Sequence, residues 1–105
     1  MTVTNSSFSD KCYALLVQVP AGKVTTYMEI ARVLNTSACR AVGTAMAKNN
    51  HLVTIPCHRV VRSDGSIGQY ALGADRKTEL LIEEGIPVKN GKIVDLRKFV
   101  HMFST

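Results

Sequence analysis

The sequence has 105 residues, of which 46% are hydrophobic and 20% are charged, and we expect one globular domain, residues 1–105, because this length is too short for two cores. No apolar run approaches the roughly 20 residues of a membrane-spanning helix, and the N-terminus lacks an export signal, so we expect no membrane partner. The formal net charge of +5 favours a polyanionic partner such as nucleic acid, or only a solvated basic face.

The cysteines are few and widely spaced. Cys12, Cys39 and Cys57 form no Cys-x-x-Cys pair, which predicts neither a disulfide framework nor a metal site, and we expect no cofactor. Free thiols favour a reducing compartment, the cytoplasm or the nucleus. The sequence shows no long apolar stripe on a helix face, and we therefore expect a monomer.

In the N-terminal half, the sequence predicts two helices that are separated by a break. Apolar residues at helical spacing predict a helix over residues 8–19, which Ser7 can cap. Residues 20–22 (Pro-Ala-Gly) break it, and residues 23–25 read as an extended piece. Thr26 and Glu29 match a capping box, which predicts a second helix over residues 27–34.

A third helix is predicted from Ser37, as its cap, to about Lys48, with Val42, Ala45 and Met46 on its inner face. Two helices joined by about three residues are typical of a helix-turn-helix. The third helix carries mainly small side chains, which permit either close packing against the first helix or entry into a groove. Arg40 lies in its first turn, from which a recognition helix normally reaches DNA bases.

The C-terminal half predicts a turn-rich loop over residues 62–68, a helix over residues 76–84 capped by Asp75, and a hairpin over residues 88–93 around Asn90-Gly91. Leu80 and Leu81 should face inward. Residues 95–103 read as a short amphipathic helix or a frayed tail. The expected fold is mainly α: a winged helix-turn-helix-like three-helix domain with a short β-hairpin and additional C-terminal helices.

Residues 55–61 (Ile-Pro-Cys-His-Arg-Val-Val) form the most informative stretch of the sequence. A cysteine attacks as its thiolate, and positive neighbours such as His58, Arg59 and Arg62 would lower the thiol pKa. The alternative is that Cys57 is a small buried hydrophobic residue. Pro56 and the polar neighbours favour a nucleophile.

Several motifs together resemble one known family. They are residues 56–60 (Pro-Cys-His-Arg-Val), 24–27 (Val-Thr-Thr-Tyr), 30–31 (Ile-Ala), 40–43 (Arg-Ala-Val-Gly) and 65–70 (Gly-Ser-Ile-Gly-Gln-Tyr). From about residue 8 to residue 85 the chain resembles the C-terminal DNA-binding and active-site domain of the methylated-DNA–protein-cysteine methyltransferases, which repair O6-alkylguanine. The separate N-terminal α/β domain of that family has no counterpart in the sequence.

The resemblance implies a DNA partner that contains O6-alkylguanine. The recognition helix would enter the minor groove, Arg40 would fill the space left by a flipped base, and Cys57 would keep the alkyl group permanently, in a single turnover. The DNA-binding residues that it implies are Thr26, Tyr27, Ala38, Arg40, Ala41 and Gly43.

The resemblance also implies roles at the reaction centre. His58, linked through a water to a carboxylate identified as Glu84, would accept the thiol proton. Tyr27 would donate to the departing guanine, and Asn49 would brace the helix against the active-site loop. Arg59 would be a structural ion-pair partner, and main-chain groups of Cys57, Val60 and Ala71 would read the base edge. The implied pocket consists of Pro56, Val60, Tyr70, Ala71 and Leu72.

One departure concerns the residues after the pocket tyrosine. The family usually has Ser and then Gly, whereas this chain has Ala71 and Leu72, and we expect narrower tolerance for bulky O6 adducts such as benzyl. Two other functions stay open. The first is an alkyltransferase-like protein, which binds the lesion for excision repair without chemistry but typically has Trp or Ala where Cys57 stands. The second is a winged-helix transcription regulator, a function that does not explain the motif at residues 56–59.

Overall fold

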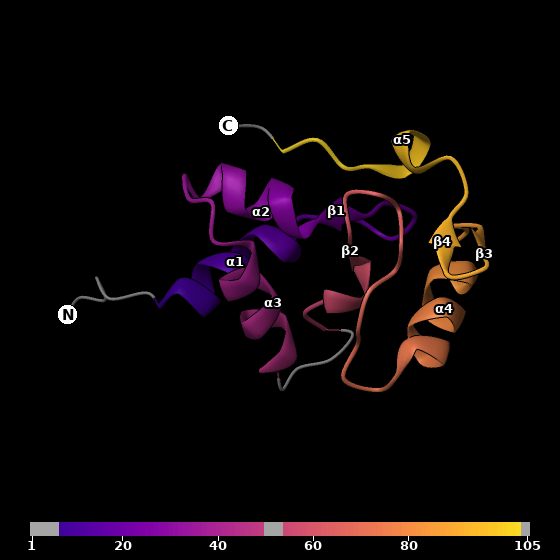
Figure 1. Cartoon of the computed structure of the whole chain (residues 1–105), viewed down its shortest axis with the longest axis horizontal. Helices are drawn as coiled ribbons and strands as arrows, with labels where there is room; N and C mark the ends of the chain where they lie inside the picture. The colour runs from indigo at the N-terminus through magenta and orange to yellow at the C-terminus, as the bar shows by residue number, and fades with distance from the viewer. Residues whose placement is uncertain (1–6, 50–53, 104–105) are drawn as a thin grey trace.

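The computed structural model describes residues 7–49 and 54–103, in which short helices alternate with two-residue strands (Figure 1). This architecture confirms the expected mainly helical fold with a short hairpin. No helix of the described part is long and apolar enough to cross a membrane. In chain order the elements are α1 (Phe8–Leu16), β1 (Thr25–Thr26), α2 (Tyr27–Val33), α3 (Cys39–Ala47), the 3-10 helix η1 (Cys57–Arg59), β2 (Val60–Val61), α4 (Ala74–Glu83), β3 (Val88–Lys89), β4 (Lys92–Ile93) and α5 (Leu96–Phe99).

Helix α1 begins with a capping box and ends earlier than predicted. The Ser7 hydroxyl accepts from the Asp10 amide at 3.1 Å, and the Asp10 carboxylate accepts from the Ser7 amide at 3.4 Å. Beyond Leu16 the chain turns instead of continuing to Val19, whose amide donates back only three residues. Pro20 keeps the helix from including Val19, because a proline disfavours the helical conformation of the residue before it.

Helix α2 has half of the capping box that the sequence predicts. The Thr26 hydroxyl accepts from the Glu29 amide at 3.0 Å. The Glu29 carboxylate does not reach back to the cap, because it instead accepts two hydrogen bonds from Arg32, at 2.9 and 2.7 Å. The ion pair replaces the second half of the box.

Helices α2 and α3 pack against each other as a helix-turn-helix, joined by residues 34–38 with Asn35 in the left-handed conformation (φ 60°). The prediction that Ser37 caps α3 is wrong. The cap position is Ala38, which has no side-chain cap bond, and the hydroxyl that accepts from the Ala38 amide belongs to Thr36. The inner face of α3 is as predicted, since Val42, Ala45 and Met46 are buried.

Two apolar clusters hold the molecule together. The first joins α1, α2 and α3 to the segment around Cys57, and the second includes residues of α4 and of the hairpin. The second cluster consists of Val24, Val61, Ile67, Leu81, Ile86 and Ile93. Leu80 and Leu81 are both buried, as predicted.

A two-stranded parallel pairing, which the sequence did not predict, connects the two clusters. Thr25 pairs with Val60, and Thr26 pairs with Val61. Strand β1 leads directly into α2, and β2 directly follows η1. The pairing therefore holds the start of α2 beside the segment that carries Cys57.

Helix α4 begins at Ala74, and the prediction that Asp75 caps it is wrong. Gly73 occupies the cap position with φ 95°, a conformation that favours glycine, and no side chain caps the helix. Asp75 lies inside the first turn, where a carboxylate interacts favourably with the helix dipole.

The hairpin of β3 and β4 has the predicted type I′ turn, since Asn90 and Gly91 both have positive φ, 54° and 75°. It packs on α4 and on the preceding loop, where the Ile67 amide donates to the Gly91 carbonyl at 3.0 Å. Figure 1 shows it at the α4 end of the molecule, away from α3. The hairpin supports the loop and does not stand free as a wing.

The C-terminal segment contains the predicted short helix only over Leu96–Phe99, and it is not a frayed tail as far as Phe103. After the single turn of α5 it runs extended beside Val24, whose amide donates to the Phe99 carbonyl and whose carbonyl accepts from the His101 amide, both at 2.8 Å. Phe103 is buried in the first cluster. The segment thus spans both clusters.

Candidate active site

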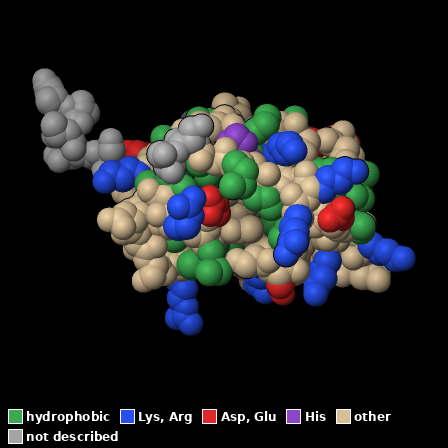
Figure 2. All heavy atoms as spheres, turned by 90° about the horizontal axis from the view of Figure 1, so that it is seen from above, with side chains coloured by type: hydrophobic (Ala, Val, Ile, Leu, Met, Phe, Trp, Pro, Cys, Tyr) green, Lys and Arg blue, Asp and Glu red, His purple; other side chains and the backbone are tan. Residues whose placement is uncertain are grey.

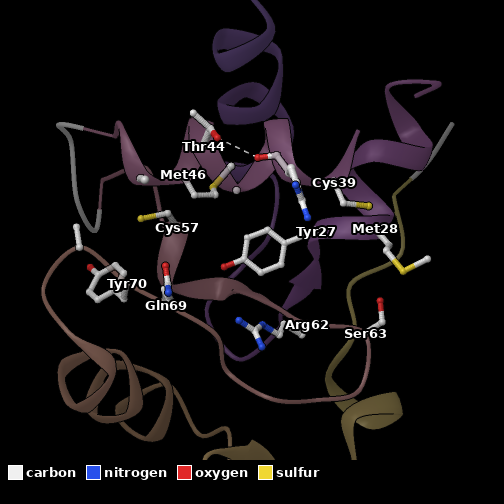
Figure 3. Close-up of a pocket in the computed structure, with 14 residues that line it drawn as sticks. Tyr27, Met28, Cys39, Thr44, Met46, Cys57, Arg62, Ser63, Gln69 and Tyr70 are labelled. Atoms are coloured by element: carbon white, nitrogen blue, oxygen red, sulfur yellow. Dashed lines mark hydrogen bonds between the residues drawn. The ribbon is translucent and has the colours of Figure 1, made fainter. Parts of the chain in front are cut away.

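A cavity of about 850 Å³ lies between α3, the start of α2, η1 and the segment that follows β2 (Figure 3). Its volume is in the range of sites that bind small molecules, and a nucleobase can fit. Among the described residues, no group of three or more His, Cys, Asp or Glu side chains is placed to hold a metal ion. The cavity is lined by Tyr27, Met28, Cys39, Arg40, Gly43, Thr44, Met46, Ala47, Cys57, Arg62, Ser63, Gln69, Tyr70 and Ala71.

Cys57 lines this cavity although only 4% of its surface is exposed. Burial raises the pKa of its thiol, and a hydrogen bond from Asn49 and the charge of Lys77 offset that rise only in part. The expectation that His58 and Arg59 lower this pKa is wrong, because both side chains bind Glu84. The resting thiol is therefore protonated near neutral pH.

Glu84, the residue after α4, joins His58 and Arg59. His58 Nε2 lies 2.9 Å from Glu84 Oε2, so the contact is direct and not through the water that the resemblance implies. Arg59 donates to both carboxylate oxygens, at 2.8 and 2.6 Å, and to the Val19 carbonyl at 2.8 Å. Arg59 thus has the ion pair that was expected of it.

The protonation states of this group follow from burial and hydrogen bonding. Burial lowers the pKa of His58 more than Glu84 raises it, so the imidazole is neutral at pH 7. Burial would raise the pKa of Glu84, but the hydrogen bonds from Arg59 and His58 outweigh it and keep the carboxylate ionised. His58 Nε2 therefore carries the proton that it donates to Glu84. The other nitrogen, Nδ1, is a lone-pair acceptor with no partner among the described residues.

Tyr27 lies in the middle of the cavity. Figure 3 shows its hydroxyl directed toward the side where Cys57, Gln69 and Tyr70 lie. Burial raises the pKa of Tyr27, which keeps the phenol protonated and able to donate. Gly68 adopts φ 76°, and a Cβ there would come within 3.3 Å of the Tyr27 hydroxyl. The glycine lets the loop backbone approach the phenol.

Asn49 connects the end of α3 to the segment that carries the thiol. It is buried, and its Nδ2 donates to the Ile55 carbonyl at 2.9 Å. This contact is of the kind that the implied bracing role requires.

The structure brings some of the other expected site residues to the cavity and not others. Arg40, Gly43, Tyr70 and Ala71 line it. Leu72 does not, and 55% of its surface is exposed. The remaining ones lie outside the lining: Thr26 caps α2, Ala38 is at the cap position of α3, Ala41 lies on α3, and Pro56 and Val60 are buried.

Sequence reasoning did not predict Lys77 or about half of the residues that line the cavity, and Lys77 is the one with a buried charge. Its side chain is fully buried, and Nζ donates to the carbonyls of Val60, at 2.7 Å, and Gln69, at 3.1 Å. The available signal was its register, because position 77 precedes the buried Leu80 and Leu81 by three and four residues and so shares their helix face. A lysine on the apolar face of a helix is unusual.

Comparison with known protein families gives one match over most of the chain. The model of the DNA-binding domain of 6-O-methylguanine DNA methyltransferase matches residues 7–86. The bifunctional methyltransferase/endonuclease of Picrophilus torridus is 46% identical over 88 residues, which cover 83% of this chain and 29% of that protein. The chain spans about half or less of the length of the curated relatives that it matches.

Solved structures of two kinds resemble the fold. S. pombe Atl1, in complex with damaged DNA containing O6-carboxymethylguanine, has a TM-score of 0.80 at 32% identity, covering 90% of this chain and 94% of that chain. The O6-methylguanine-DNA methyltransferase from Pyrococcus kodakaraensis has a TM-score of 0.71 at 45% identity, covering 77% of this chain and 47% of that chain.

Proposed function

This chain belongs to the family of the O6-methylguanine DNA methyltransferases, and we propose that it repairs DNA by transferring the alkyl group of O6-alkylguanine irreversibly to Cys57. One observation carries the proposal: a cysteine faces a cavity large enough to admit a nucleobase, and the residue after it is a neutral imidazole with an unused lone pair. A nucleophile, a base and a group that orients the base are the minimum set for such a transfer.

The reaction needs one bond to form and one to break. The Cys57 sulfur attacks the alkyl carbon, the carbon–O6 bond breaks, and its electron pair returns to the guanine ring. The thiol proton passes to His58 Nδ1, directly or through a water, and Tyr27 donates a proton to the departing base. The resulting imidazolium can return a proton to the Tyr27 phenolate. The product is a thioether, so each molecule acts once.

The pKa shifts at the site determine when the thiol loses its proton. The pKa of Cys57 is raised and that of His58 is lowered, both mainly by burial. Proton transfer from the thiol to His58 is therefore uphill in the free protein. We infer that deprotonation accompanies attack, when the negative charge moves on from sulfur to the guanine.

The DNA partner follows from the face on which the cavity opens. Arg40 and Gly43 of α3 line it, and a Cβ placed on Gly43 would meet no atom of the described residues within 4 Å, so this part of the helix is open. Arg40 would occupy the space left by the flipped base, whose extrusion costs a few kcal/mol and less when it is damaged. Other basic side chains are spread over the face seen in Figure 2 and are not gathered into one patch. They suit attraction to phosphates in general.

A second candidate function is binding of the lesion without chemistry. The TM-score of 0.80 to S. pombe Atl1, in complex with damaged DNA containing O6-carboxymethylguanine, favours it. The presence of Cys57 together with the His58–Glu84 pair favours transfer, since a protein that only binds needs neither a thiol nor a base.

Intact mass measurement after incubation with a duplex that contains O6-methylguanine tests the proposal. We expect a gain of one methylene, absent in Cys57→Ala and retained in the matched control Cys12→Ala, whose thiol is buried away from the cavity. Binding of the lesion duplex without a gain in mass would support the second candidate. The absence of both binding and a gain in mass would contradict both functions and leave a regulatory role.

A further inference from the structure

Lys77 is a buried cation without a buried anion to match it. Its side chain is fully buried, and in the described part of the chain no carboxylate lies within ion-pair distance of it. A buried charge lowers stability unless it is compensated. The acceptors of its hydrogen bonds are the carbonyls of Val60 and Gln69.

These carbonyls belong to two walls of the site. Val60 follows η1, which carries Cys57, and Gln69 itself lines the cavity on the side where Cys57 lies (Figure 3). Nζ also lies 6.0 Å from the centroid of the Tyr27 ring. The ammonium group therefore lies behind the cavity, between the thiol segment, the loop and the phenol.

We propose that Lys77 is a positioning residue whose ammonium charge stabilises the thiolate that develops on Cys57 during alkyl transfer. The inference rests on the proposed function and extends it, because it supplies the positive charge that the neighbours of Cys57 in sequence do not. His58 is neutral, and Arg59 is paired with Glu84. Lys77 is left as the cation that acts on the sulfur.

The interaction is reciprocal. The charge of Lys77 lowers the pKa of Cys57, and a thiolate at Cys57 raises that of Lys77. Burial lowers the pKa of Lys77 to about 8, so the ammonium form still predominates at pH 7. The charge of Arg62, an exposed residue, also lowers this pKa. The remaining titratable neighbours are His58, on which Lys77 acts, and the protonated Tyr27.

Three substitutions separate the charge from the hydrogen bonds. Lys77→Gln keeps N–H donors but removes the charge, Lys77→Met removes both, and Lys77→Arg keeps both. The matched control is Arg76→Gln, which removes an exposed charge from the adjacent position of α4. Circular dichroism checks that each variant is folded, and Lys77→Gln decides the question if Lys77→Met does not fold.

The first readout needs no DNA. Iodoacetamide reacts with the thiolate, so its rate of labelling at Cys57, followed by peptide mass spectrometry over a range of pH, reports the thiol pKa. We expect Lys77→Gln and Lys77→Met to slow labelling about tenfold at pH 7, which corresponds to a thiol pKa higher by about one unit, and the difference to shrink above about pH 8, where the ammonium of the unmodified protein loses its proton. Lys77→Arg should restore most of the rate, and Arg76→Gln should label like the unmodified protein.

The second readout is the rate of methyl transfer from a lesion duplex, with the affinity for that duplex measured separately. We expect Lys77→Gln to slow transfer about tenfold, by the same shift in pKa, with the affinity retained. Lys77→Gln behaving like the unmodified protein in both readouts would overturn the role of the charge and leave only a structural brace. If the unmodified protein transfers nothing but its labelling profile still depends on Lys77, the proposed function fails and the electrostatic coupling stands.

Discussion

Two opposing effects act on the pKa of the Cys57 thiol. Burial disfavours its thiolate, whereas Asn49 and Lys77 favour it, and burial is the larger effect. A protonated, enclosed thiol reacts slowly with small electrophiles and oxidants. We infer that the thiol stays unreactive until a flipped nucleobase enters the cavity and takes up the negative charge.

Glu84, the carboxylate that orients His58, gives a first prediction. Glu84→Gln keeps an oxygen for His58 Nε2 but loses the negative charge that Arg59 and His58 bind. We expect methyl transfer to be roughly a hundredfold slower and the free energy of unfolding to fall by about 1.5–3 kcal/mol. Single-turnover kinetics and urea unfolding measure the two effects. Glu79→Gln, an exposed carboxylate of α4, is the control, and an equal loss of rate in both variants would argue against a specific role of Glu84.

Leu72 gives a prediction that corrects an expectation from the sequence. Its side chain is exposed and outside the cavity lining, so it does not narrow the pocket in the way that the departure from the family pattern suggested. We expect Leu72→Gly to change the ratio of benzyl to methyl transfer rates by no more than about twofold. Competition between the two lesion duplexes measures this ratio, and a tenfold change would mean that Leu72 reaches the adduct.

For single residues, the sequence was a better guide to which side chains belong to the candidate site than to the direction of their pKa shifts. His58 stood out from the motif around Cys57, whereas Glu84, Tyr27 and Asn49 were implied by the resemblance to the family. The direction of the thiol pKa was wrong, because burial cannot be read from neighbours in sequence. The register of Lys77 indicated burial, but its role was missed because the acceptors of its hydrogen bonds are backbone carbonyls of residues 60 and 69, which no sequence motif marks.

Among the elements, the β1–β2 pairing does most to position the site. Each strand has only two residues, yet together they hold the start of α2, with Tyr27, against the segment that carries Cys57. Helix α3 completes the cavity from the other side, and Asn49 fixes its end through the Ile55 carbonyl. The reacting groups thus come from separate segments that meet at one short sheet.

Helix α3 gives a prediction for DNA binding. Arg40→Ala should weaken binding of a lesion duplex by about tenfold, since a base-replacing contact contributes about 1–3 kcal/mol. Transfer from the free O6-methylguanine nucleoside should be unaffected, because no base has to be flipped. Fluorescence anisotropy gives the affinity. Lys11→Ala removes an exposed cation from α1 as a control, and the same loss in both variants would show that only net charge matters.

Local signals predicted the elements that depend on local interactions. Ser7, Thr26 and the Asn90-Gly91 pair each gave the start of a helix or a turn correctly. The parallel strands were not predicted, because two residues show no periodicity and their partners are 35 positions apart, as in Thr25 and Val60. The helix caps that failed, Ser37 and Asp75, are polar residues one or two positions from the true cap.

Over the whole molecule, the C-terminal segment links the two apolar clusters. It pairs with Val24 in the second cluster and buries Phe103 in the first. It also lies outside residues 7–86, the part that matches the family. None of its described residues lines the cavity, and we therefore expect it to contribute to stability.

Phe103→Ala tests this contribution. Removing a buried aromatic side chain costs about 3 kcal/mol, and we expect this loss in urea unfolding. The folded variant should still transfer methyl groups at the rate of the unmodified protein, because Phe103 does not line the cavity. A large loss of transfer with unchanged stability would show that the segment acts on the site itself.

The most direct test of the account follows the carbon atom. A duplex that contains O6-methylguanine with a ¹³C-labelled methyl group is incubated with the protein, and the labelled peptide is located by mass spectrometry and the methyl signal by NMR. The account predicts one labelled methyl group per molecule, bound to the sulfur of Cys57. Label that stays in the DNA while the protein remains bound to the lesion would contradict it.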